Sequence, residues 1–110
     1  MEKFSITALA REHLDVARES SSGRSASTVF GGHEHTLRQT VIAIKAGHKL
    51  SDHANPGEAT VQVLHGRVRL TAGPISWEGS RGDLLIIPPA VHSLEAIEDS
   101  AVLLTAAKLQ

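Results

Sequence analysis

The most informative stretch of the sequence is Gly82-Asp83-Leu84-Leu85-Ile86-Ile87-Pro88-Pro89-Ala90-Val91-His92. Its apolar run, 83–87, predicts a short strand. Two prolines close the run, because proline has no backbone N–H to donate to a sheet. A second stretch with a glycine and a histidine lies upstream, Gly47-x5-His53-Ala54-Asn55-Pro56-Gly57-Glu58, and runs on to Gly66. Together the two stretches indicate where a functional site is to be sought.

Short β-rich runs continue on both sides of these stretches. They are separated by Gly, Pro, Asn and Asp, which are typical turn residues, and they cover residues 37–45, 59–64, 67–71, 75–78, 91–97 and 101–107. His65-Gly66 indicates a tight hairpin turn between two of these runs. Many short strands at this spacing are typical of an antiparallel sandwich or barrel. We therefore predict an all-β domain over residues 28–110.

The first part of the chain has a different pattern. Residues 7–19 place apolar side chains at helical spacing and charged ones between them, with Thr7 as a candidate N-cap. The run Ser20-Ser21-Ser22-Gly23 ends this periodicity. Residues 1–27 are thus predicted to form a short amphipathic helix and a serine-rich connection. The helix is expected to lie against the outside of the barrel or against a partner subunit.

The two glycine-and-histidine stretches resemble the two sequence motifs of the cupin superfamily. With their flanking strands they cover residues 40–107, in the order and at the separation that the family shows. The resemblance is to a small, single-domain cupin of the RmlC-like type. It implies an antiparallel double-stranded β-helix, also called a jelly roll or cupin barrel, here with a short N-terminal α-helix.

The resemblance also implies a divalent metal held by His-x-His, a carboxylate and a third histidine. In this sequence only His53 and His92 match the metal-binding histidines. Asn55 stands where the second histidine is expected, and the carboxylate position falls on Ala59, with Glu58 one residue away and on the other face. Two imidazoles and an amide make a poor transition-metal site. The cofactor is therefore left open: the site is degenerate, with a divalent transition metal bound weakly if at all.

The resemblance places His53, Asn55 and His92 together inside the barrel. Val61, Val63 and Ile87 are expected to wall this cavity, and Ala59 leaves space where the carboxylate would stand. Gln39 shares a strand face with Val41 and Ala43, so it points into the cavity or is a satisfied polar residue at a strand end. Trp77 lines a pocket, plugs one end of the barrel or anchors a dimer contact. His33 and His35 are either compensating ligands or part of a solvated loop.

The composition of the chain argues against several classes of site and binding partner. The chain of 110 residues has no cysteine, which excludes disulfides and thiolate metal sites, and its formal net charge is -1. No basic patch suggests nucleic acid, and no apolar run is long enough to span a membrane. A cytoplasmic protein is expected.

The resemblance also implies a homodimer. Strands 37–45 and 101–107 support this expectation, because both of their faces are apolar and the outer face must be covered by the N-terminal helix or by a partner subunit.

These observations support two functions of different classes. The first is a small-molecule-binding barrel with a degenerate or weak metal site. The alternative is a metal-dependent enzyme, an oxygenase or isomerase, that uses His53 and His92. A sensory or regulatory module ranks last, because the chain has barely room for an additional DNA-binding domain. Fold alone does not decide between them, since one barrel supports many activities.

Overall fold

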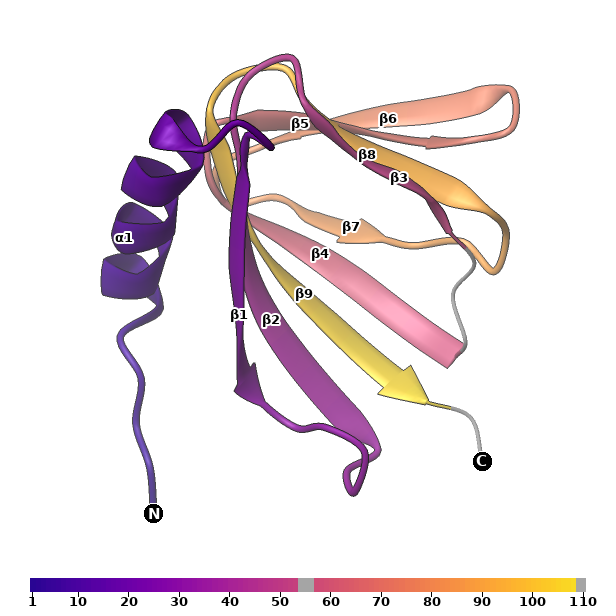
Figure 1. The fold of residues 1–110 in the computed structure, drawn as a ribbon. Coiled ribbons are helices and arrows are strands. Elements are labelled where there is room, and N and C mark those ends of the chain that lie inside the picture. The colour runs from indigo at the N-terminus through magenta and orange to yellow at the C-terminus, as the bar shows by residue number, and fades with distance from the viewer. Residues whose placement is uncertain (54–56, 109–110) are drawn as a thin grey trace.

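This computed structural model describes residues 1–53 and 57–108, except for the side chains of residues 51–53. Within these ranges one helix precedes nine strands (Figure 1). The elements are α1 (Ile6–Glu19), β1 (Arg24–Phe30), β2 (Leu37–Ile44), β3 (Lys49–His53), β4 (Gly57–His65), β5 (Arg67–Ala72), β6 (Ile75–Ser80), β7 (Leu84–Ile86), β8 (His92–Ala96) and β9 (Ser100–Lys108). No helix in the described part of the chain is long and apolar enough to cross a membrane.

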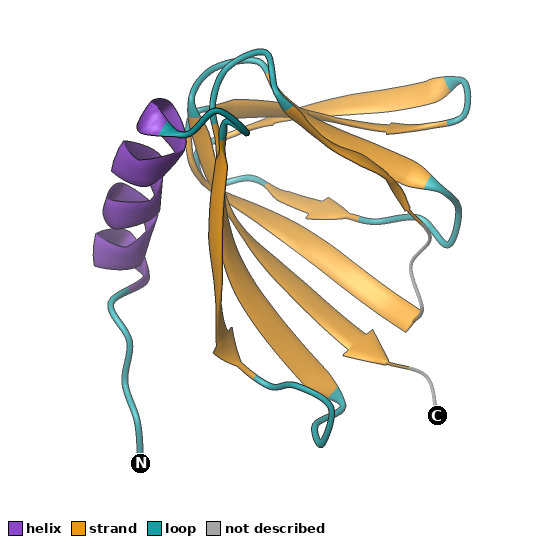
Figure 2. Ribbon diagram, viewed as in Figure 1, coloured by secondary structure: helices purple, strands orange, loops and turns teal. Residues whose placement is uncertain are grey.

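The strands form two antiparallel sheets that face each other. The five-stranded sheet has the order β1-β2-β9-β4-β7, and the four-stranded sheet has the order β3-β8-β5-β6. Figure 2 shows the two layers meeting near the helix and separating toward the opposite end. The predicted all-β jelly roll with one short helix is confirmed.

The turn at Gly66 differs from the prediction of a hairpin. β4 pairs with β7 and β9, whereas β5 pairs with β6 and β8, so the chain crosses from one sheet to the other at this glycine. The φ angle of Gly66 is 80°, a value that side-chain-bearing residues rarely adopt. The turn is tight, as predicted, but it forms a corner of the barrel.

The core lies between the two sheets. β4 illustrates why: Ala59, Val61 and Val63 are buried, while Glu58 and Gln62 next to them are exposed. Because side chains alternate along a strand, each strand contributes every second residue to the interior. The resulting cluster contains Ile42, Ile44, Ala59, Val61, Val63, Val68, Leu70, Leu85, Ile87, Leu94, Ala96 and Val102.

Helix α1 covers part of the outer face of the five-stranded sheet. Its buried residues Ala10, Leu14 and Ala17 recur at helical spacing and pack against Ala43 and Ala101. The helix thus covers part of the outer apolar face of β2 and β9 that the sequence predicted. The N-cap is Ser5 and not Thr7, because the Ser5 hydroxyl accepts a hydrogen bond from the Ala8 N–H at 3.2 Å.

The side chain of His13 connects helix α1 to β1. The Nδ1 and Nε2 atoms of His13 lie 2.6 and 2.8 Å from the hydroxyls of Ser25 and Ser27. β1 begins at Arg24, four residues before the predicted start of the barrel at 28. Serine is not a typical strand residue, but here Ser25 and Ser27, on the same face of β1, point toward the helix. Both hydroxyls contact the ring of His13. The barrel and the serine-rich connection therefore overlap.

The corner at Gly66 generates a stability prediction. A Cβ atom at Gly66 would collide with the Asp99 carbonyl and the Ser100 hydroxyl, whereas one at Gly73 would meet nothing within 4 Å. Both glycines have positive φ, so only the collision distinguishes them. Gly66→Ala is expected to cost about 2–4 kcal/mol of unfolding free energy, and Gly73→Ala about 1 kcal/mol. Urea unfolding followed by circular dichroism measures both, and equal losses would contradict the packing argument.

The outer faces of the two sheets differ, and this generates a prediction about assembly. On the four-stranded sheet Arg67 and Arg69 form ion pairs with Glu78 at 2.8 and 2.9 Å, and they hold the pKa of Glu78 below its usual value. On the five-stranded sheet Leu84 and Ile86 are each 58% exposed. We expect the predicted homodimer to use the part of this face around Leu84 and Ile86.

Light scattering should then give twice the chain mass of 11.7 kDa, and Ile86→Glu should shift the population to monomer, because the charge would be buried unpaired. Ser76→Glu, on the polar sheet, is the control. A wild-type monomer at micromolar concentration would refute the dimer.

Candidate functional site

His92 stands at the point where β8 begins, and its side chain is buried. Its Nδ1 atom lies 2.9 Å from the carbonyl oxygen of Ala90. A carbonyl only accepts, so Nδ1 carries the proton of this hydrogen bond, and in the neutral imidazole Nε2 is the acceptor. The same short segment is stiffened by a bond of 2.8 Å from the Ala90 N–H to the Pro88 carbonyl. His92 therefore holds the 88–90 segment in place.

The interior next to His92 is almost filled. The described side chains around it are aliphatic: Ile42, Leu50, Val61, Leu70, Ile87, Leu94, Val102 and Leu104. They leave a cavity of about 10 Å³, which is about the space of one water molecule. Val61 and Ile87 lie beside His92 as expected, and Val63 and Ala59 belong to the same core. The space between these side chains is too small for an organic ligand.

The histidine of the first motif is placed only by its backbone. The pairing of β3 with β8 sets His53 opposite His92. The side chain of His53 and the whole of Asn55 lie outside the described residues. The convergence of His53, Asn55 and His92 therefore stays a prediction.

Gln39 lies on the outer face of the five-stranded sheet. It shares that face with Val41 and Ala43, and Ala43 packs against the helix outside the barrel. Its Nε2 atom donates to the hydroxyl of Thr105 at 3.3 Å. The expectation that Gln39 points into the cavity is thus corrected. The alternation along β2 grouped these residues properly, but it carried no information about which group faces inward.

Trp77 lines a second, larger pocket at the mouth of the barrel. This pocket has a volume of about 210 Å³ and is lined by Leu70, Ala72, Ile75, Trp77, Pro88 and Ala90. Trp77 and Ile75 pair with Leu70 and Ala72, so all four share the inner face of the four-stranded sheet. Leu70 borders both this pocket and the filled interior. The mouth pocket is thus the outward continuation of the core.

Sequence reasoning identified Trp77 but missed the other residues of the mouth pocket. A signal for this pocket was present in the sequence. Ile75 and Trp77 alternate with polar residues, which indicates that they share one face of strand β6. The remaining histidines considered from the sequence do not line this pocket. His33 and His35 lie in the exposed connection between β1 and β2, where the ring of His35 contacts Phe30 at a centroid distance of 4.9 Å.

The described residues do not by themselves fit a metal ion. Among them no group of three or more His, Cys, Asp and Glu side chains is placed to hold one. Of the described side chains around this pocket only His92 carries an imidazole and the rest are aliphatic, and the carboxylate position is occupied by Ala59. An aliphatic surrounding disfavours a divalent cation, because it replaces none of the ion's hydration.

Comparison with known proteins supports the fold. No family model and no curated protein matches the sequence. A conserved protein of unknown function from Streptococcus pyogenes is 21% identical with a TM-score of 0.76, and the alignment covers 99% of this chain and 89% of that one. A cupin superfamily protein from Desulfitobacterium hafniense is 13% identical with a TM-score of 0.72, covering 78% of each chain.

An RmlC-like cupin from Desulfovibrio desulfuricans is 26% identical with a TM-score of 0.66, and the alignment covers 76% of this chain and 81% of that one. The alignment to the streptococcal protein covers almost the whole chain and so includes helix α1, whereas those to the two cupins cover about three quarters of it. The resemblance first seen in two motifs is confirmed by the whole architecture: the chain has the fold of the small RmlC-like cupins.

Proposed function

We propose that this cupin binds a small, largely apolar organic molecule at the mouth of its barrel. The observation that carries the proposal is the mouth pocket, where Ile75 and Trp77 are 59% and 53% exposed although they lie on the inner face of their sheet. Inner-face side chains are normally covered by the opposite sheet. Here the interior is filled only deeper in the barrel, next to His92, so the apolar surface of Ile75 and Trp77 stays accessible to a ligand.

The walls of the pocket favour a flat ligand with little charge. All six lining residues are apolar, and the indole of Trp77 gives a face on which an aromatic or planar group can stack. The opposite wall is the 88–90 segment, which the hydrogen bond from His92 keeps in place. A wall held in advance loses little freedom when a ligand binds, which favours affinity.

The sole tryptophan makes this proposal testable by fluorescence. N-phenyl-1-naphthylamine, a neutral aromatic probe, is expected to bind saturably with increased emission and with energy transfer from Trp77. Ile75→Glu should raise its dissociation constant about tenfold, because ligand binding would desolvate the new carboxylate. Val16→Glu is the matched control, since Val16 is 56% exposed on α1 and lines none of the pockets described here.

Two results would refute the mouth site. One is a wild-type titration in which emission never saturates. The other is an Ile75→Glu variant that binds the probe as tightly as Val16→Glu does.

A metal-dependent enzyme is the alternative, and one observation favours it. The backbone register places the two motif histidines directly opposite each other on neighbouring strands. Such an enzyme needs at least one further ligand, and the described lining of the His92 pocket is otherwise aliphatic. We therefore propose a degenerate site and not a catalytic metal centre.

Metal content separates the two functions. Protein purified without a histidine tag is expected to carry well below one equivalent of transition metal by mass spectrometry, because two imidazoles and an amide without a carboxylate hold such ions poorly. His53→Ala is measured in parallel. Near-stoichiometric metal in the wild type that disappears in this variant would overturn the degenerate site and favour the enzyme.

A further inference from the structure

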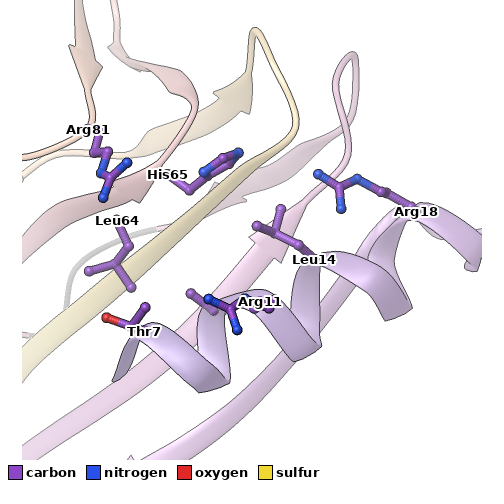
Figure 3. Close-up of a pocket in the computed structure, with 8 residues that line it drawn as sticks. Thr7, Arg11, Leu14, Arg18, Leu64, His65 and Arg81 are labelled. Atoms are coloured by element: carbon purple, nitrogen blue, oxygen red, sulfur yellow. The ribbon is translucent and has the colours of Figure 1, made fainter. Parts of the chain in front are cut away.

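A separate pocket lies outside the barrel, between helix α1 and the sheet it covers. Its volume is about 380 Å³, and it is lined by Thr7, Ala10, Arg11, Leu14, Arg18, Leu64, His65 and Arg81 (Figure 3). This volume is within the range of sites for small organic ligands. The pocket shares no residue with the mouth pocket or with the cavity at His92.

The helix contributes one stripe of the lining. Thr7, Arg11, Leu14 and Arg18 follow one another at intervals of three and four residues, so their side chains lie along one face of α1 (Figure 3). The first turn of α1 contains no acidic residue. The partial positive charge of the helix N-terminus near Thr7 is therefore not offset by a side chain of that turn.

The facing wall is held by backbone hydrogen bonds. The turn between β6 and β7 that carries Arg81 is fixed to β4, because the Gly82 N–H donates to the Val63 carbonyl at 2.8 Å and the Val63 N–H donates to the Asp83 carbonyl at 2.9 Å. His65 is the last residue of the same strand β4. Arg81 and His65 thus face the helix stripe from a rigid position (Figure 3).

The charge of the pocket is one-sided. Three arginines and a histidine line it, and none of the lining residues is acidic. Arg18 is paired with Asp99 at 2.9 Å and with Asp15 at 3.4 Å. Arg11 and Arg81 form no ion pair within the described ranges 1–53 and 57–108. Two guanidinium groups therefore face a cavity without a counter-charge.

We propose that this pocket binds a phosphomonoester whose organic part rests on the apolar floor of Ala10, Leu14 and Leu64. A guanidinium group binds phosphate oxygens through paired N–H donors. Arg11 and Arg81 approach from opposite walls, so they suit the three terminal oxygens of a phosphate better than the two of a carboxylate. The floor gives an ester an advantage over inorganic phosphate, because it offers apolar contact to the esterified group.

Isothermal titration calorimetry with phenyl phosphate tests this assignment. Wild-type protein is expected to bind phenyl phosphate at least about tenfold more tightly than inorganic phosphate, benzoate or phenol. Arg11→Gln and Arg81→Gln should each weaken binding of phenyl phosphate at least about tenfold, because each removes charged donors to the phosphate. Arg38→Gln is the control, since Arg38 is exposed on β2 and does not line the pocket.

Both test positions are exposed, so these variants should fold, and circular dichroism checks that they do. Failure of phenyl phosphate to bind at millimolar concentration would overturn the proposal. Equal binding of benzoate or inorganic phosphate would overturn the choice of a phosphomonoester. Binding that neither arginine variant weakens would overturn the location.

Discussion

The close contact between Gly66 and the Asp99–Ser100 backbone fixes the closed end of the barrel. The hydroxyl of Ser100, fully buried, accepts from the Arg67 N–H at 3.0 Å and lies within hydrogen-bond distance of the Glu98 and Arg67 carbonyls. These bonds join the corner where the chain changes sheet to the turn before β9. A side chain at residue 66 would separate the two, so the layers can meet here only because the residue is glycine.

Asp99 extends this junction to the helix. One carboxylate oxygen accepts from the Ala46 N–H at 2.9 Å and the other from Arg18 at 2.9 Å, and these donors hold the pKa of Asp99 below its usual value. The carboxylate thus stays charged at neutral pH and connects the turn before β3 with α1. With one end of the sandwich closed in this way, the sheets separate toward the other end, where the mouth pocket lies (Figure 1).

The sequence predicted the parts of this architecture that depend on local pattern. The runs at 37–45 and 101–107 correspond to β2 and β9, and the helical spacing of Ala10, Leu14 and Ala17 corresponds to α1. It did not predict relations between distant segments. That Gly66 is a corner depends on which strands pair, and that Gln39 faces outward depends on where the helix lies. The pocket between α1 and β4 was not predicted for the same reason, since Arg11 and Arg81 are seventy residues apart in the sequence.

His92 has a structural role that does not depend on a metal. In the cupin motif its position is that of a ligand, and a histidine there is easily taken as a remnant of metal binding. In this structure its Nδ1–H donates to the Ala90 carbonyl, and Ala90 and Pro88 form one wall of the mouth pocket. A ligand histidine also commonly donates its second nitrogen to a carbonyl. The geometry that would orient an imidazole toward a metal is therefore the same geometry that positions this wall of the mouth pocket.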